Sequence, residues 1–404
     1  MNLDRDVAAM EPFRILTFNR ISASGLARFP AGRYLVGPEL SAPDAILLRS
    51  HNLQAAAVAA SVRAIGRAGA GTNNIAVAEM SRRGIPVFNA PGANANAVKE
   101  LVLAALLLAA RNVMPALAYV AALPVGAADY ERRVEDGKKQ FAGFELPGRT
   151  LGIIGLGAVG GLVADAAIKL GMNVLGFDPE ITVDGAWRLP ASVRKANSVE
   201  EVLRLSDLVT LHLPLIDSTR NLISERRLAQ IRPGAALLNF ARDAIVDERA
   251  VLDALRAGRL KYYICDFPSP TLAGEPGAIA LPHLGASTEE AEENCAVMVA
   301  DRIRDFLENG TIRHSVNFPD VEVTRGSPHR LAIANANVPN MLGQISTTLA
   351  HFGLNIHDME NKSRGEIAYT LVDVDSRIEE AVVKSISAID GVLSVRMIGV
   401  SPEV

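Results

Sequence analysis

The chain has 404 residues, 49% of them apolar, and a net charge of −4. This length accommodates two or three domains, and the weakly acidic balance gives no electrostatic basis for binding nucleic acid or a membrane surface. No apolar run reaches the roughly 18 residues of a membrane span, and the first residues lack the apolar region of a signal peptide. Two cysteines are too few for a disulfide framework, so we expect a cytoplasmic protein.

The first segment alternates short apolar strands with helices, which predicts an open parallel sheet. The expected strands cover residues 13–18, 45–48, 62–66 and 86–88. A long, largely apolar helix should follow from about 93 to 113, and residues 124–148 are expected to be irregular and polar.

Residues 151–160, Leu-Gly-Ile-Ile-Gly-Leu-Gly-Ala-Val-Gly, predict a strand, a glycine turn and the start of a helix. Gly155 permits the tight turn, Gly157 lets a pyrophosphate approach the backbone, and Gly160 lets the helix lie close to the sheet. The free N–H groups of the helix N-terminus would face the phosphates. The alternative is a tight turn that binds no nucleotide.

A second strand, residues 173–177, leads to Asp178. A carboxylate there accepts hydrogen bonds from ribose hydroxyls and repels a 2′-phosphate, which favours NAD over NADP. Further strands are expected at 208–213, 235–240, 262–266 and 278–281. A helix from 289 to about 308 should return the chain to the first domain, so that two crossings form a hinge around a ligand cleft.

The last 75 or so residues follow a linker at about 321–327 and have a β-α-β-β-α-β pattern, which is ferredoxin-like. The expected elements cover residues 331–336, 341–352, 355–361, 367–374, 379–389 and 392–400. We therefore predict an α/β chain with two doubly wound parallel-sheet domains and a C-terminal ferredoxin-like domain. A flavodoxin-like domain (1–92 and 287–320) holds an inserted Rossmann domain (93–286), and residues 328–404 form the last domain.

Two side chains at strand ends point to chemistry in the cleft. Arg242 ends a buried strand, where a guanidinium can hold a carboxylate and polarise a neighbouring carbonyl. His283 follows another strand and could exchange a proton with a substrate oxygen near neutral pH. The alternatives are a surface ion pair of Arg242 with Asp243 and a histidine satisfied by backbone groups. No bound metal is expected.

The chain resembles the D-isomer-specific 2-hydroxyacid dehydrogenases. Seven segments carry this resemblance: Gly155-Leu-Gly-Ala-Val-Gly, Asp178-Pro, Leu211-His-Leu-Pro, Arg232-Pro-Gly-Ala, Asn239-Phe-Ala-Arg, Cys265-Asp-Phe and Pro282-His-Leu-Gly-Ala-Ser-Thr. The terminal region is similar to ACT regulatory domains, which favours the branch that oxidises 3-phospho-D-glycerate to 3-phosphohydroxypyruvate at the start of serine biosynthesis. The alternatives are a hydroxypyruvate or glyoxylate reductase, another D-2-hydroxyacid dehydrogenase, and a non-catalytic NAD sensor.

The resemblance also implies roles for individual residues. Arg242 and His283 match the substrate-carboxylate arginine and the acid/base histidine, and Asp266 matches an acid near the nicotinamide. The other implied NAD contacts are Gly155, Gly157, Ala158, Val159, Gly160, Asp178, His212, Pro214, Thr219 and Phe240. The implied substrate contacts are Arg49, Ser50, Arg67, Ala70, Gly71 and Asn94. The resemblance further implies a homodimer or homotetramer.

Three departures from the family pattern affect the expected site. The glutamate that normally supports the histidine is absent, and we expect Glu275, the first acid after Asp266, to replace it catalytically. Asp243 stands where the family favours glycine. An L-serine effector would bind between paired ACT domains through Asn335, Asn337 and Asn355. Asn340 replaces the usual glycine of the turn and Asn335 replaces a histidine, so the alternative is a domain that only joins subunits.

Overall fold

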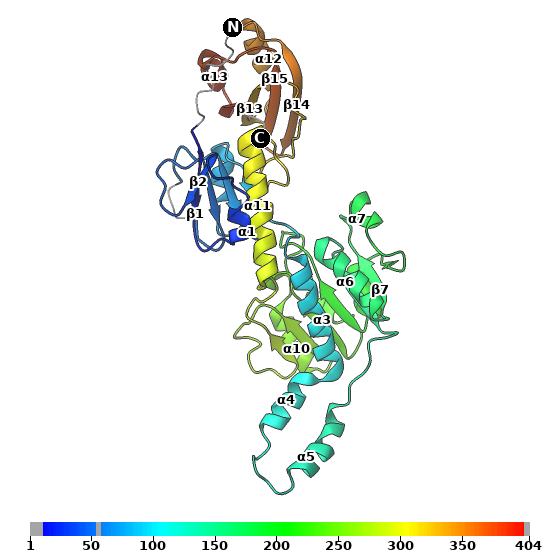
Figure 1. The fold of residues 1–404 in the computed structure, drawn as a ribbon. Helices are drawn as coiled ribbons and strands as arrows, with labels where there is room; N and C mark the ends of the chain where they lie inside the picture. Colours follow the sequence, from blue (N-terminus) through cyan, green and yellow to red (C-terminus); the bar gives the residue numbers. More distant parts are fainter. Residues whose placement is uncertain (1–10, 54–57, 400–404) are drawn as a thin grey trace. The chain divides into compact units, whose positions relative to one another are not determined.

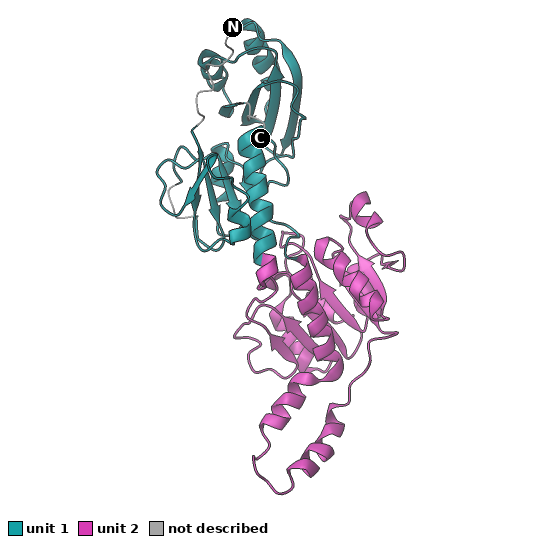
Figure 2. Cartoon of the chain, viewed as in Figure 1, with its two compact units in different colours: residues 1–94, 292–404 teal, residues 95–291 magenta. Residues whose placement is uncertain are grey.

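The computed structural model describes residues 11–53 and 58–399. The chain forms two compact units, the first made of residues 1–94 and 292–404 and the second of residues 95–291 (Figure 2). Each unit is described by itself below. The predicted α/β fold with a separate antiparallel sheet is confirmed, whereas the predicted limits of three domains stay a prediction.

The first unit begins with a five-stranded parallel sheet in the order β2-β1-β3-β4-β5 (Figure 1). Its elements are β1 (Phe13–Thr17), α1 (Ala23–Leu26), β2 (Tyr34–Gly37), β3 (Ala45–Leu48), β4 (Ala64–Arg67), α2 (Val77–Arg82) and β5 (Val87–Phe88). Most of α11 (Glu289–Asn309) belongs to this unit and packs on the sheet. A Cβ atom at Gly66 would lie 2.4 Å from Val299 and 2.5 Å from Ile303, so glycine allows this close packing.

The C-terminal sheet is antiparallel, with the order β14-β15-β13-β16. Its elements are β13 (His329–Ala336), α12 (Met341–His351), β14 (Ile356–Arg364), β15 (Ile367–Val374), α13 (Glu380–Ser387) and β16 (Val392–Ile398), which confirms the predicted β-α-β-β-α-β order. Side chains alternate between two buried faces. Leu331 and Ile333 pack with α12 and α13, whereas Ala332 and Ala334 pack in the core that includes α11.

Polar contacts tie the C-terminal sheet to the segment that precedes it. Tyr369 Oη donates to Gly310 O at 2.7 Å, and Arg364 donates to Ser315 O at 2.9 Å. Val321, at the start of the predicted linker, is fully buried and pairs with Ile312. The segment that leads into the sheet is therefore part of the core of the first unit.

The second unit contains a seven-stranded parallel sheet in the order β12-β11-β10-β9-β6-β7-β8. Its strands are β6 (Thr150–Ile154), β7 (Asn173–Phe177), β8 (Arg194–Lys195), β9 (Leu208–Leu211), β10 (Ala235–Asn239), β11 (Leu260–Cys265) and β12 (Ala278–Ala280). Its helices include α3 (Ala95–Arg111), α6 (Ala158–Lys169), α7 (Val183–Trp187), α8 (Val199–Leu205), α9 (Glu225–Leu228) and α10 (Glu248–Arg256). The strand order reverses between β6 and β9, and ligands of such sheets bind at that point.

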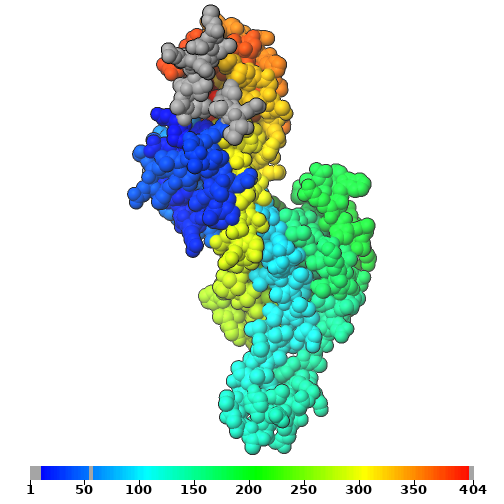
Figure 3. Space-filling view, viewed as in Figure 1, coloured from blue at the N-terminus to red at the C-terminus, as the bar shows by residue number. Residues whose placement is uncertain are grey.

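The prediction of an irregular segment at 124–148 is wrong for much of its length. After α4 (Val113–Ala121), the chain forms α5 (Tyr130–Gly137) and a 3₁₀ turn at Lys138–Phe141, and this segment protrudes from the second unit (Figure 3). Asp129 pairs with Arg132 and Arg133, each at 2.9 Å, around the start of α5. Tyr130 and Val134 are the large apolar residues of α5 and are only partly buried, so this short, polar helix gives a weak sequence signal.

The other predicted elements are present with ends shifted by a few residues. The sequence analysis missed β2, the two-residue β8 and the helices α4, α7, α8 and α9, and the long helix ends at Arg111, with α4 beginning after Asn112. Asp247 caps α10 by accepting from Ala250 N, and Gly258 follows that helix with φ +66°. In the described part of the chain, no single helix could cross a membrane by length and apolarity; only α3 and α4 together, bent by 67°, would meet those criteria.

A buried ion pair makes the stability of the C-terminal sheet testable. Asp373 binds Arg330 at 2.6 and 2.9 Å, and the two side chains are at most 1% exposed. Asp373→Ala leaves the cation buried without its partner and should lower the free energy of unfolding by about 3–5 kcal/mol in urea titrations. Asp390→Asn, an exposed control, should change it by less than about 0.5 kcal/mol. Equal unfolding midpoints for the wild type and Asp373→Ala would contradict a stabilising role.

The same pair predicts the direction of a pH effect. Burial would raise the pKa of Asp373, but hydrogen bonds from Arg330 and Gly326 N outweigh it and hold the pKa below its usual value. The resulting stability is present above about pH 4 and is lost as the pH falls through the lowered value. Asp373→Ala should therefore lose part of this acid sensitivity.

Candidate active site

The glycine turn after β6 has the geometry expected of a dinucleotide site. Gly155 has φ +92°, and a Cβ atom there would lie 2.3 Å from His212 O. A Cβ at Gly160 would lie 1.9 Å from Gly155 O, so helix α6 can approach the turn only at a glycine. A Cβ at Gly157 would meet nothing within 4 Å, which leaves open space where a pyrophosphate could approach the backbone. Ala158 and Val159 form the first turn of α6.

Asp178 is fixed beside this turn at the end of β7. Its two carboxylate oxygens accept from Leu156 N at 2.8 Å and Glu180 N at 3.0 Å. A cavity of about 450 Å³ adjoins it, lined by Asp178 and by the apolar residues Leu156, Ile181, Leu189 and Val193. An apolar slot beside an oriented carboxylate suits a nucleoside, with the base in the slot and the ribose at the carboxylate. Lys195 also lines this cavity and was missed, because β8 is too short to leave a sequence signal.

His212 follows β9, where its backbone N donates to Ile154 O at 2.8 Å. Its Nε2 lies 3.0 Å from Thr210 Oγ1, and burial of the ring lowers the pKa of His212 to about 3. The imidazole is therefore neutral at physiological pH. In the loop that follows, Thr219 Oγ1 donates to Pro214 O at 2.6 Å, which fixes the turn that carries both predicted residues.

Arg242 follows β10 and is exposed. Its NH1 donates to Ala241 O at 2.6 Å, and Asn239 Nδ2 holds the Arg242 carbonyl at 2.9 Å. None of the ion pairs in the described part of the chain involves Arg242, so the alternative of a pair with Asp243 is not observed. Asp243 begins a 3₁₀ turn and is absent from the positive-φ residues of the described chain, so this position does not need glycine. Phe240 is buried behind this segment.

His283 lies on a loop that Asp266 holds in place. The Asp266 side chain is buried and accepts from Leu284 N and Gly285 N, both at 2.7 Å. His283 is exposed, has φ +58°, and presents its ring to the edge of Phe267 at a centroid distance of 5.2 Å. The alternative of a buried histidine is therefore not observed.

Glu275, expected beside His283, has another partner in this structure. Its carboxylate binds Arg256 of α10 at 3.0 Å. The His283 ring contacts Phe267, and no hydrogen bond or ion pair between Glu275 and His283 occurs among the described residues. A catalytic role for Glu275 thus stays a prediction, and the pairing of Glu275 with Arg256 does not favour it.

The residues predicted to bind substrate lie in the first unit, on loops at the carboxyl ends of β3 and β4. Arg49 pairs with Glu292 at 2.6 Å, and Arg67 Nε donates to Arg49 O at 3.1 Å. Asn19 accepts from the backbone of Ser50, which fixes the loop further. The predicted contacts Ala70 and Gly71 follow β4, and Asn94 precedes α3; all three are partly buried.

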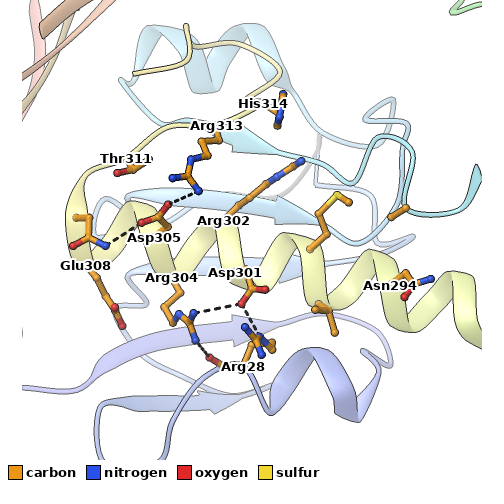
Figure 4. A pocket seen from close by; sticks show the side chains of 14 residues that line it. Arg28, Asn294, Asp301, Arg302, Arg304, Asp305, Glu308, Thr311, Arg313 and His314 are labelled. Atoms are coloured by element: carbon orange, nitrogen blue, oxygen red, sulfur yellow. Dashed lines mark hydrogen bonds and ion pairs between the residues drawn. The ribbon is translucent and has the colours of Figure 1, made fainter. Parts of the chain in front are cut away.

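A cavity of about 850 Å³ lies along α11 in the first unit (Figure 4). Its arginines are largely neutralised by acids of the same lining. Asp301 pairs with Arg28 at 2.7 Å and with Arg304 at 3.6 Å, and Asp305 pairs with Arg313 at 3.6 Å. This compensated lining does not select an anion, and it contains none of the predicted site residues.

The three predicted effector residues are not together within one chain. Asn335 is buried near the end of β13, and Asn337 follows that strand. Asn355 precedes β14 and lies at the other end of the sheet from Asn335. The first residue of β14 pairs with Val374, and Val374 pairs with His329, the first residue of β13. Asn340 has φ +65°, the left-handed conformation for which asparagine is a good substitute for glycine.

Comparison with known proteins agrees with this geometry. A sequence profile of the D-isomer specific 2-hydroxyacid dehydrogenase, NAD binding domain, matches residues 106–285. The D-3-phosphoglycerate dehydrogenase of Haemophilus influenzae is 34% identical over 341 residues, which are 81% of this chain and 79% of that protein.

Solved structures show the same fold. An NAD+-bound 3-phosphoglycerate dehydrogenase of Entamoeba histolytica is 25% identical, with a TM-score of 0.59 over 76% of this chain and 99% of that chain. A glyoxylate reductase from Paecilomyes thermophila is 26% identical, with a TM-score of 0.61 over 76% of this chain and 99% of that chain.

The contact at Gly160 can be tested with a neighbouring control. Gly160→Ala places a methyl group against Gly155 O, so it should lower the free energy of unfolding by about 1–3 kcal/mol and weaken NADH binding. Gly161→Ala lies next to it in α6, and its methyl group would be no closer than 3.6 Å to Leu189. That control should retain binding and stability, because alanine is favoured inside helices. Wild-type NADH fluorescence titrations for Gly160→Ala would contradict the steric argument.

Proposed function

The chain belongs to the D-isomer-specific 2-hydroxyacid dehydrogenase family, and we propose that it oxidises 3-phospho-D-glycerate to 3-phosphohydroxypyruvate, the first step of phosphorylated L-serine biosynthesis. Its cofactor is NAD, as the family profile states for the domain that it matches. The observation that supports the substrate best is the similarity to D-3-phosphoglycerate dehydrogenases over about four fifths of the chain.

The residues around the glycine turn fit NAD. The N–H groups of α6 and the open space at Gly157 would receive the pyrophosphate, and the Asp178 carboxylate would bind the adenosine ribose. The bound nicotinamide supplies a hydride acceptor for C2 of the substrate. Neutral His212, Pro214 and Thr219 follow β9, on the side of the switch point where the nicotinamide half would lie.

Arg242 and His283 perform the chemistry in this proposal. The guanidinium of Arg242, with no competing carboxylate in the second unit, holds the substrate carboxylate through two hydrogen bonds. An imidazole nitrogen of His283 accepts the proton of the 2-hydroxyl group as the hydride leaves C2, which yields the keto acid and a protonated imidazole. Asp266 and Phe267 fix the loop and the ring of His283.

The phosphate end of the substrate is assigned to Arg49 and Arg67, which come from neighbouring loops and touch through Arg67 Nε and Arg49 O. The runner-up substrate is a plain keto acid such as hydroxypyruvate or glyoxylate, which the similarity to a glyoxylate reductase keeps open. A non-catalytic NAD sensor is less well supported, because Arg242 and His283 are both present and exposed at strand ends.

Three further proposals concern the oligomeric state of the enzyme, its effector and its cellular compartment. The protruding segment 113–141 exposes Met114, Leu117 and Val120, which supports assembly into a homodimer or homotetramer. L-serine would bind only where two C-terminal domains pair, because Asn335 and Asn355 lie at opposite ends of one sheet. The two free, buried cysteines support a reducing compartment, the cytoplasm.

The proposed substrate is tested by comparing kcat/KM for 3-phospho-D-glycerate and D-glycerate, each with NAD+ and with NADP+. Charge-assisted hydrogen bonds to the phosphate should favour the phosphorylated substrate by roughly 10²-fold. Asp178 should make NAD+ the better cofactor. A higher kcat/KM for D-glycerate, or for glyoxylate in the reverse direction with NADH, would favour the runner-up reaction.

The role of His283 is tested by His283→Asn, which retains a polar side chain but cannot exchange the proton. Turnover should fall by roughly 10²-fold or more, while the Kd for NADH stays nearly unchanged. His351→Asn, on α12 of the C-terminal sheet, is the control and should keep wild-type turnover. Ordinary turnover in His283→Asn would remove the histidine from the mechanism.

A further inference from the structure

A second cavity, of about 350 Å³, lies in the first unit where the C-terminal sheet meets the segments before β4 and β5. Its polar lining comes from both sides: Arg63 and Arg83 from the first sheet region, and Ser394 and Arg396 from β16. Phe306 of α11 and Leu393 form part of its apolar wall. Among the described residues, the lining contains three arginines and no carboxylate, in contrast to the compensated cavity of Figure 4.

Arg396 is the side chain with the largest unmet hydrogen-bonding capacity in this lining. Its guanidinium lies 4.3 Å over the ring of Phe306, and its NH2 donates to Phe306 O at 3.0 Å. Its Nε and NH1 atoms are buried and have no hydrogen-bond partner among the described residues. Burial lowers the pKa of Arg396 to about 10, but the group remains a cation at neutral pH. Buried donors without partners destabilise a protein, and a charged group does so most.

Of the two other arginines, Arg83 adds an uncompensated charge to the cavity. Arg63 is exposed and pairs with Asp44 at 3.4 Å, so its charge is partly compensated, although Asp44 does not line the cavity. Among the described residues, Arg83 NH2 donates to the carbonyls of Val58 and Ala59, at 3.0 and 3.1 Å, and carbonyls do not cancel its charge. Tyr369 also lines the cavity, but its hydroxyl already donates a hydrogen bond to Gly310 O.

We propose that this cavity binds a small anion that carries a phosphate or carboxylate group. Arg396 Nε and NH1 are enclosed in this structure, so a rotation of the guanidinium would bring them to the anion, with Arg83 adding charge and Ser394 exchanging its long 3.4 Å hydrogen bond to Gly84 O for one to the anion. The apolar wall of Phe306 and Leu393 leaves room for a short hydrocarbon body. Because the lining joins β16 to the first sheet region, the bound anion would stabilise the packing between them.

Binding is tested with intact protein by calorimetry and thermal unfolding, using inorganic phosphate, acetate and L-serine as separate probes, with chloride at matched ionic strength. The wild type should bind at least one probe and unfold at a higher temperature with it. Arg396→Met should weaken that binding about tenfold or more and abolish the rise in unfolding temperature. Phosphate alone would identify a phosphate site, and acetate or L-serine a carboxylate site.

Two variants of neighbouring arginines provide a matched comparison that does not alter Arg396. Arg83→Gln should also weaken binding, whereas Arg82→Gln removes the same charge from the adjacent, exposed residue outside the lining and should not. Anion binding at the proposed substrate site would persist in all three variants, so the lost heat reports on this cavity alone. Wild-type binding of every probe by Arg396→Met and Arg83→Gln, or no binding by the wild type beyond the chloride control, would overturn the proposal.

Discussion

The site depends on one constraint of parallel sheets, namely that the carboxyl ends of all strands lie at the same edge. In the second unit this rule brings together the turn after β6, Asp178 after β7, His212 after β9, Arg242 after β10 and Asp266 after β11. The reversal of strand order between β6 and β9 opens a crevice there, because the connections leave that point in opposite directions. Binding and chemistry therefore occur at one edge, although these residues span more than a hundred positions of sequence.

The loop of His283 is held by side chains other than the glutamate that is typical of the family. The glutamate typical of the family is absent, and Glu275 is bound to Arg256. The Asp266 carboxylate instead fixes the two peptide groups that follow His283, and Phe267 contacts the imidazole ring. Both residues come from the end of β11, so a rigid strand orients the loop that carries the proposed acid/base group.

The central strands of the C-terminal sheet, β13 and β15, are buried on both faces, which limits how the sheet can act. Its own helices cover one face, and the core containing α11 covers the other. The buried pair of Arg330 and Asp373 and the hydroxyl of Tyr369 add directional contacts to this packing. A ligand that reaches the sheet within one chain must therefore enter at its margin, as the cavity beside Arg396 allows.

The sequence alone determined the order of the elements, the glycine turn, the NAD preference implied by Asp178 and the strand-end positions of Arg242 and His283. These features are local, because periodicity, glycine spacing and caps act over a few residues. Tertiary structure decided that Glu275 pairs with Arg256 and that Asp266 holds the loop of His283. It also decided the separation of Asn335 from Asn355 and the cavity beside Arg396. Each of these depends on contacts between distant segments, which no local pattern encodes. Helix α5 was missed because it is short and polar, with two partly buried apolar residues, Tyr130 and Val134, as its sequence signal.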